Sequence, residues 1–217
     1  MFRDAVIRTY GKDATIRGYA DCDILATMSH GDPWEVRLLK WATHKWLTPE
    51  SHVIFAGGFY GSSPIWLSQV VAHVTTFEAD PKLYALLVHN LRTNNITNVT
   101  AINGALWDSS GDRVSVHEAP RNYGSGGCKL DTGGTTLTTT LDDLNFTEVT
   151  WMDLDVEGAE NRVISGALQM LENCHPNLTV EIHGREGVSQ QAITDQVEQL
   201  GYVIGKDCFF HSPGDWD

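Results

Sequence analysis

Residues 52–81 read HVIFAGGFYGSSPIWLSQVVAHVTTFEADP, and this stretch decides the fold. A short apolar run at 53–55 leads into a glycine-rich turn, which an amphipathic segment and a second apolar run follow. The second run ends on an acid, Glu78. Short apolar runs joined by a helical segment are typical of buried parallel strands with a crossover helix. The stretch therefore predicts a βαβ unit whose glycine turn and acid lie at one edge of a sheet.

This arrangement indicates a site for a cofactor that contains adenosine. Glycines let the backbone approach a ligand, and an acid at the end of the second strand accepts hydrogen bonds from ribose hydroxyls. Glu78 lies 17 residues after Gly61, near the offset of about 20 residues expected for such an acid. The glycines do not follow the G-x-G-x-x-G spacing, so a tight turn between core elements is the competing interpretation.

The composition is that of an acidic folded domain. The chain has 217 residues, of which 41% are hydrophobic and 20% charged, enough for one α/β domain with a buried core. Fifteen basic and 28 acidic residues leave a net charge of −13. Such a field repels a duplex or an anionic membrane, so we expect neither as a partner. We expect one domain over 1–217, with 1–50 as an N-terminal extension or cap.

Cysteine usage favours a reducing compartment. The four cysteines are widely spaced and form no C-x-x-C pair: Cys22, Cys128, Cys174 and Cys208. This pattern fits neither a zinc knuckle nor a dense disulfide framework. No basic-then-apolar leader opens the chain, and no run of 18 apolar residues occurs. We therefore expect a cytoplasmic protein.

Strand and helix patterns alternate along the chain. Apolar spacing predicts a helix over 34–47, with Asp32 as its cap and Pro33 just inside it. A glycine-rich region at 108–135 predicts a hairpin and a loop. The strands expected are 52–56, 74–78, 99–103, 149–155 and 177–182, and the helices are 63–72, 81–94, 159–172 and 189–200.

The C-terminal segment predicts a final hairpin of residues 202–204 and 208–211, joined by the turn at 205–207. The predicted fold class is therefore α/β, with a Rossmann-like, mostly parallel sheet of about seven strands. The C-terminal antiparallel hairpin forms its edge, and helices cover both faces.

Ligands of such sheets bind beyond the carboxyl ends of the strands, so the residues there are the site candidates. After the third strand, Gly104, Ala105 and Leu106 form a slot suited to an adenine ring, whereas Trp107 suits the slot or the core equally. Asp155 lies at the mouth of the fourth strand, on the same face as Asp153.

The fifth strand ends in Glu181-Ile182-His183. Glu181 and His183 share one face and are expected to meet Asp155 across neighbouring strands. A histidine there can take a proton near neutral pH, although a hydrogen-bonded core histidine is the competing interpretation. Glu157 is a further candidate, while Glu160 suits the start of a helix.

Five strings resemble the FkbM-type methyltransferases, a class I family that uses S-adenosylmethionine and acts mainly on hydroxyl oxygens of small molecules such as sugars and polyketides. The strings are FEADP at 77–81, NL and NN within 90–95, TTTLDDL at 138–144, DLDVEGAE at 153–160 and EIH at 181–183. The pair WE at 34–35 adds to them. The resemblance implies Asp155 beside the transferred methyl group and cofactor contacts at Gly57, Gly58, Gly61, Glu78, Gly104, Ala105 and Leu106.

The first strand departs from the family pattern, which ends D-x-G-A-N-x-G. Phe55 and Phe59 stand where the family has the acid and the asparagine. Three consequences are open: weaker cofactor binding, transfer of the acid's role to Glu35 or Asp155, or loss of activity.

We therefore expect an S-adenosylmethionine-dependent O-methyltransferase acting on a small-molecule or saccharide acceptor. An alcohol needs a base, for which His183 or Asp155 is the candidate, with Glu181 orienting the histidine. We expect no resident metal, although Asp155, Glu181 and His183 form a ligand set suited to Mg²⁺ or Mn²⁺. The alternatives are a degenerate, non-catalytic cofactor-binding or interaction module with the same fold and, less well matched by the acids at 153–157, a nicotinamide dehydrogenase.

Overall fold

A six-stranded parallel sheet forms the centre of the protein. This computed structural model describes residues 1–117, 123, 127–182 and 188–212. The sheet order is β12-β11-β10-β3-β4-β5, and every neighbouring pair is parallel. Its strands are β3 (His52–Ala56), β4 (His73–Glu78), β5 (Val99–Asn103), β10 (Trp151–Leu154), β11 (Asn177–Glu181) and β12 (Cys208–His211).

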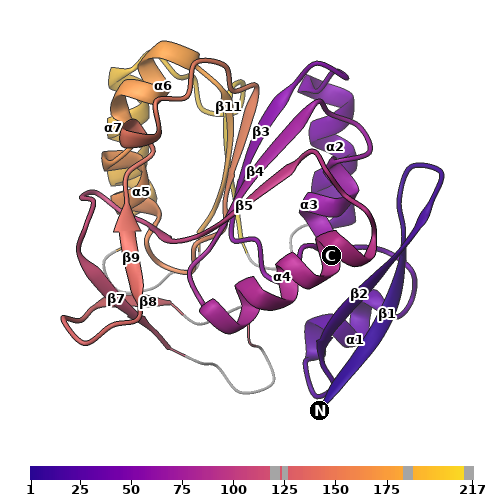
Figure 1. Ribbon diagram of the computed structural model, residues 1–217. Coiled ribbons are helices and arrows are strands. Elements are labelled where there is room, and N and C mark those ends of the chain that lie inside the picture. Colours follow the sequence, from indigo (N-terminus) through magenta and orange to yellow (C-terminus); the bar gives the residue numbers. More distant parts are fainter. Residues whose placement is uncertain (118–122, 124–126, 183–187, 213–217) are drawn as a thin grey trace.

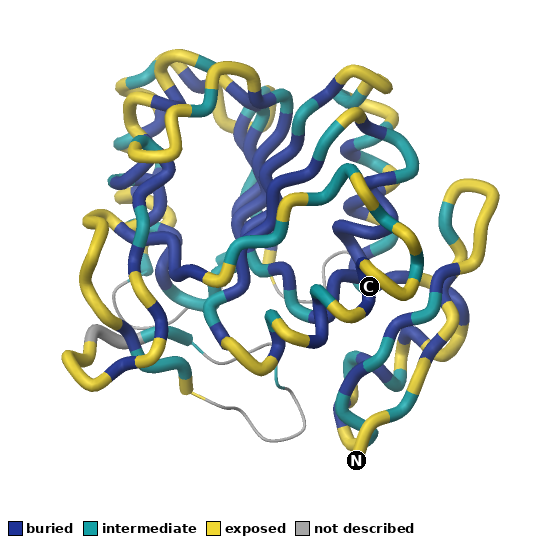
Figure 2. The backbone as a smooth tube through the Cα atoms, viewed as in Figure 1, coloured by how far each residue is buried: buried dark blue, intermediate teal, exposed yellow. Residues whose placement is uncertain are grey.

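Helices cover both faces of the sheet, as predicted (Figure 1). On one face, α5 (Glu160–Ser165), α6 (Leu168–Cys174) and α7 (Gln190–Gln199) pack over Ile54, Met152 and Val180. On the other, α2 (Val36–Trp46) and α3 (Ser62–Leu67) pack over Val53, Phe55 and Trp151. Successive strand residues thus pack into opposite cores, and Figure 2 shows the central strands buried over most of their length.

The predicted C-terminal antiparallel hairpin is wrong. Residues 202–204 form no strand: Ile204 makes only an isolated parallel bridge to Cys208, the turn covers 205–207, and β12 pairs parallel with β11. The cause is α7, which links β11 to β12 as a crossover helix and so returns the chain in the same direction. Tyr202 is buried and stacks on His175, which fixes the turn to the helical layer.

Several predicted boundaries shift. The helix expected at 34–47 begins at Val36, and neither Asp32 nor Pro33 lies within it. The helix expected at 159–172 is divided into α5 and α6 near Gly166. A Cβ at Gly166 would lie 2.0 Å from the Trp107 carbonyl oxygen, so this position admits only glycine. In contrast, α4 (Pro81–Thr93) begins as predicted, with Asp80 accepting a hydrogen bond from the Lys82 amide (2.7 Å).

A second, small sheet follows the third strand of the main sheet. Its order is β6-β9-β7-β8, with β7 and β8 antiparallel, which confirms the hairpin predicted within 108–135. The strands are β6 (Ala105–Leu106), β7 (Arg113–Val116), β8 (Cys128–Leu130) and β9 (Thr136–Thr139). A 3₁₀ turn, η2 (Asp142–Leu144), then leads toward β10.

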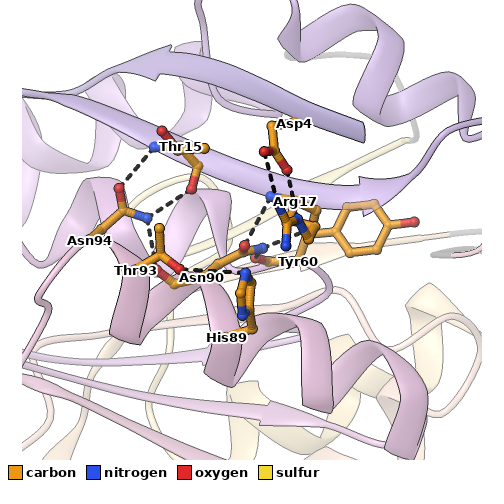
Figure 3. Close-up of polar contacts among 8 residues, drawn as sticks. All are labelled: Asp4, Thr15, Arg17, Tyr60, His89, Asn90, Thr93 and Asn94. Atoms are coloured by element: carbon orange, nitrogen blue, oxygen red, sulfur yellow. Dashed lines mark hydrogen bonds and ion pairs between the residues drawn. The ribbon is translucent and has the colours of Figure 1, made fainter. Parts of the chain in front are cut away.

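The N-terminal hairpin of β1 (Phe2–Arg8) and β2 (Asp13–Tyr19) docks on α4 and precedes α1 (Asp23–Met28) (Figure 3). Asn90 accepts a hydrogen bond from the Arg17 amide and donates to the Arg17 and Tyr60 carbonyls, at 2.8–2.9 Å. One turn later, Asn94 makes the same two-way contact with Thr15, at 2.8 Å. We call this pair of side chains the amide clasp, because it pairs with the edge of β2 as a neighbouring strand would.

The turn after β3 depends on one close backbone contact. Gly57 has a φ of +99°, and a Cβ placed there would lie 2.1 Å from the Asp155 carbonyl oxygen. The Asp155 amide in turn donates to the Ala56 carbonyl (3.1 Å), which extends the pairing of β3 with β10. Glycine is required here because the two strand ends meet. Within the described residues, no helix is long and apolar enough to cross a membrane.

The clasp gives a first prediction. Asn90→Ala leaves two carbonyls and one amide without their partner, so we expect a loss of about 2–4 kcal/mol in the free energy of unfolding. Urea unfolding followed by circular dichroism measures it. Asn173→Ala, at an exposed position of α6, is the matched control and should change stability by less than about 0.5 kcal/mol. Equal effects would contradict the assigned role.

The strand contact gives a second prediction. Gly57→Ala combines an unfavourable φ with a backbone overlap, so we expect a loss of about 3 kcal/mol or more. Gly111 also has a positive φ, +92°, but a Cβ there meets nothing within 4 Å. Gly111→Ala therefore isolates the φ penalty and should cost only about 1–2 kcal/mol. Similar losses in the two variants would show that the approach of Asp155 is unimportant.

Candidate active site

A cavity lies at the carboxyl ends of the parallel strands, where the topology places a ligand. Its walls come from the glycine turn, the ends of β4, β5 and β10, and the β7–β8 hairpin. The lining residues are Gly57, Phe77, Glu78, Ala79, Asp80, Leu83, Gly104, Ala105, Leu106, Trp107, Val116, Tyr123, Cys128, Asp155, Val156, Glu157 and Ala159. We call it the cofactor cavity.

Glu78 is buried at the floor of the cofactor cavity, and the backbone fixes both of its oxygens. Oε2 accepts a hydrogen bond from the Phe59 amide and Oε1 from the Asp80 amide, each at 2.8 Å. Burial raises the pKa of the Glu78 carboxyl to about 7, although these amide donors oppose the shift. A carboxylate has about four acceptor positions, more than these backbone amides occupy, so it can still receive a ribose hydroxyl.

The three glycines of the turn have different surroundings. Gly57 lines the cavity, whereas Gly58 and Gly61 do not. A Cβ at either of these two would meet Leu87 of α4, at 3.0 and 3.2 Å. Their place in the turn therefore serves the packing of α4, and their contact with a cofactor stays a prediction.

The two phenylalanines that depart from the family pattern lie outside the cavity lining. Phe55 is buried in the cluster beneath α2 and α3 and meets Trp151 edge-on, with ring centroids 6.2 Å apart. Phe59 has a left-handed backbone, φ 45°, a conformation that asparagine adopts more readily than a bulky residue. Its ring stacks on Tyr60 while its amide binds Glu78. The backbone contact with the acid is thus retained without the asparagine.

The segment after β5 forms the opposite wall. Gly104, Ala105 and Leu106 line the cavity as predicted, and the Gly104 amide donates to the Glu78 carbonyl (3.2 Å). Trp107 also lines it and is buried, and its Nε1 has no acceptor among the described residues. A buried indole N–H without a partner is a donor available to a ligand.

Two carboxyl groups lie at the ends of β10 and β11, and a third comes from the start of α2. Asp155 lines the cavity, and burial and then the charge of Glu181 hold its pKa well above the usual range. A side-chain hydrogen bond joins the two groups, and such a bond requires a proton on one of them. The predicted meeting of Asp155 and Glu181 is therefore observed. The charge of Glu35, at the start of α2, raises the same pKa.

Asp153 is fully buried deeper in the sheet, away from the cavity lining. Thr179 donates a very short hydrogen bond to its Oδ1 and accepts one from Trp151 Nε1 (2.9 Å). Burial raises the pKa of Asp153, against the effect of the Thr179 hydroxyl. Its role is thus to anchor strands β10 and β11 beneath the site.

The two remaining acids of the DVEGAE string, Glu157 and Glu160, lie in different surroundings. Glu157 lines the cavity and has a left-handed backbone, φ 55°. Glu160 is buried in the first turn of α5, where its Oε1 accepts a hydrogen bond from the Gly158 amide (2.9 Å). Glu157 therefore belongs to the site and Glu160 to the helix start.

His183, the predicted base, lies outside the described residues. A different histidine joins the carboxylates: His211, at the end of β12, is the register partner of Glu181. One ligand atom each of Glu35, Glu181 and His211 lies within 4.8 Å of the others, and all three residues are buried. Sequence reasoning missed His211 because the predicted antiparallel hairpin pointed its strand the other way. A parallel assignment of residues 208–211 would have found it.

A second, larger cavity opens beside Glu35. It measures about 420 Å³ and is lined by Thr27, His30, Asp32, Pro33, Trp34, Glu35, Val36 and Arg37. Trp34 lines this cavity with an aromatic side chain, and Tyr123 lines the cofactor cavity. Trp41 and Trp46 pack instead on each other and on Phe209.

The donor and acceptor groups fit an adenosine-containing cofactor. Glu78 offers carboxylate oxygens to the ribose, Trp107 offers a free indole N–H, and Gly104 leaves a flat wall. The cofactor cavity is only about 60 Å³, below the ~300–1,000 Å³ of small-molecule sites. The cofactor cavity must therefore widen for a nucleoside to enter.

The chain is similar to several solved structures of distant sequence. They include an FkbM methyltransferase from Methylobacillus flagellatus KT (TM-score 0.44, 18% identity, 62% of this chain and 33% of that one). An rRNA methylase from Streptococcus thermophilus is another, with a TM-score of 0.45 and 12% identity over 74% of this chain and 76% of that one. A precorrin-6y C5,15-methyltransferase from Geobacter metallireducens GS-15 is a third, with a TM-score of 0.46 and 16% identity over 79% of this chain and 73% of that one. These scores carry no functional argument, and the chain spans only a third of the first protein's length.

No curated protein matches the chain significantly. The family comparison is decisive: the methyltransferase FkbM domain matches residues 65–204, more than half of the sequence. This match includes Glu78, the segment after β5 and the DVEGAE string, and it confirms the resemblance predicted from them. The chain therefore belongs to the FkbM domain family of S-adenosylmethionine-dependent methyltransferases.

Proposed function

We propose that the protein transfers a methyl group from S-adenosylmethionine to a hydroxyl oxygen of a small molecule, with a saccharide as the best-matched acceptor. The family supplies the reaction class. The observation that carries the choice of oxygen is Asp155, a carboxylate with a raised pKa on the wall of the cofactor cavity.

Different walls of the cofactor cavity bind different parts of the cofactor. S-adenosylmethionine, when bound, supplies an electrophilic methyl group on a sulfonium. Glu78 receives the ribose hydroxyls, while Gly104, Ala105 and Leu106 form the flat wall for adenine. Trp107 Nε1 donates a hydrogen bond to the ligand. The chain's own part is therefore to orient the donor and exclude water, which supplies much of the rate in an in-line displacement.

Asp155 supports transfer to an alcohol because an alcohol is a poor nucleophile until a base takes its proton. A carboxylate of ordinary pKa is a weak base at neutral pH. Burial and the neighbouring Glu181 strengthen Asp155 in this respect, and its backbone lies against the glycine turn, where the resemblance to the family implies the methyl-bearing end of the cofactor.

The larger cavity supports the acceptor class. Its 420 Å³ suits a small molecule. Trp34 offers an aromatic face, and the polar groups of His30, Asp32 and Arg37 can hydrogen-bond several hydroxyls. Polyhydroxylated rings need both kinds of contact.

A non-catalytic module with the same fold is the second candidate. Phe55, Phe59 and the narrow cofactor cavity favour it. Calorimetry with S-adenosylhomocysteine and a methyl-transfer assay together separate the two: the enzyme binds the ligand saturably and methylates a hydroxyl compound, whereas absence of binding at millimolar ligand leaves only the module.

Glu78 gives the prediction for cofactor binding. Ribose hydroxyls donate to the ionised carboxylate, so binding favours that form. With a pKa of about 7, the affinity for S-adenosylhomocysteine should rise about tenfold from pH 6 to pH 8. Glu78→Gln should lose this pH dependence and bind about 10- to 100-fold more weakly.

Isothermal titration calorimetry measures both effects. Glu172→Gln, on the exposed side of α6, is the matched control and should keep the wild-type affinity and pH profile. An unchanged affinity in Glu78→Gln would refute the ribose contact.

Asp155 gives the prediction for turnover. Asparagine keeps the size of the side chain but cannot take a proton, so Asp155→Asn should lower kcat about 10²- to 10⁴-fold and leave S-adenosylhomocysteine binding within a few-fold. Release of labelled product from a panel of alkyl glycosides and polyols measures it. Asp195→Asn, exposed on α7, is the control. Full activity in Asp155→Asn excludes it as the base.

A further inference from the structure

Three buried side chains converge at the carboxyl edge of the sheet, beside the cofactor cavity. Glu35, Glu181 and His211 are 5%, 5% and 6% exposed, and one ligand atom of each lies within 4.8 Å of the other two. Two carboxylates and an imidazole at such separations match the size of a first coordination shell around a single ion.

The fold, and not the local sequence, assembles this group. Glu181 and His211 are register partners on parallel strands, so they leave the same edge side by side. Glu35 comes from a distant segment and has a left-handed backbone, φ 55°, immediately before α2. Helix α2 packs on the same sheet face through Leu38 and Leu39, which lie in one cluster with Val53.

The ligand chemistry selects a class of ion. Carboxylate oxygens suit Mg²⁺ and Mn²⁺, and an imidazole nitrogen suits first-row transition metals, so the mixed set favours a divalent first-row cation. A neutral imidazole and two carboxylates balance a double positive charge. Buried charged groups are retained where they are paired or bind a metal.

We propose that Glu35, Glu181 and His211 bind a divalent first-row cation, with Mn²⁺ as the best match. The group links the two cavities: Glu35 lines the larger one, and Glu181 is hydrogen-bonded to Asp155, which lines the cofactor cavity. In a role that rests on the proposed function, a cation held by these residues would lower the pKa of an acceptor hydroxyl.

The experiment measures metal binding without cofactor or acceptor. The full chain is stripped with EDTA, dialysed and titrated with Mn²⁺ while electron paramagnetic resonance follows the free ion. We expect saturable binding of one equivalent. His211→Gln and Glu35→Gln should each weaken it at least tenfold, and His44→Gln, exposed on α2, should leave it unchanged. Affinities equal to wild type in both site variants would overturn the proposal.

A second readout on the wild-type protein covers the case in which a variant does not fold. Electron spin echo modulation of bound Mn²⁺ should show coupling to one ¹⁴N nucleus, from His211. Bound Mn²⁺ without nitrogen coupling is an adventitious ion and overturns the site, as does an absence of saturable binding at millimolar Mn²⁺. Calorimetry with S-adenosylhomocysteine on the same samples keeps the two ideas apart, because retained cofactor binding without metal binding refutes the cation alone.

Discussion

The contact between Gly57 and the backbone of Asp155 is the constraint on which the site depends. It brings the end of β3 against the end of β10, and the amide of Asp155 completes the seam by donating to Ala56. Because the main chain of Asp155 is fixed in this way, its side chain is directed toward Glu181 and the cofactor cavity. A glycine that looks like a ligand contact in the sequence is thus first a requirement of strand packing.

The same edge of the sheet holds a group of acids at unusual protonation equilibria. Burial raises the pKa values of Glu78, Asp153 and Asp155 in a chain whose net charge is already −13. Backbone amides and a threonine hydroxyl partly offset the burial of Glu78 and Asp153. Burial and then the charges of Glu181, Glu35 and Glu157 hold the pKa of Asp155 well above its usual range. The chain thus lacks the family's acid at position 55 but has several other carboxyl groups at the same edge of the sheet.

Local sequence patterns predicted what local interactions determine. The strands at 52–56 and 99–103 have the predicted bounds, and Glu78 lies at the predicted strand end, because apolar runs and a Pro-marked helix start act over a few residues. His211 and Glu35 were not placed, because their positions depend on pairing across the fold. A Gly-Lys-Asp turn reads as a hairpin until the crossover through α7 is known, and no local pattern reveals the left-handed backbone of Glu35.

Parallel pairing of β12 also sets an order of assembly. Glu35 leaves the ribosome early, but its partner His211 is synthesised 176 residues later. The sheet can add β3, β4, β5, β10 and β11 before β12 exists, since β12 takes only the outer place beside β11. A nascent chain therefore carries two converging carboxylates without their imidazole until the last strand docks. The group of Glu35, Glu181 and His211 is therefore complete only after synthesis has passed residue 211.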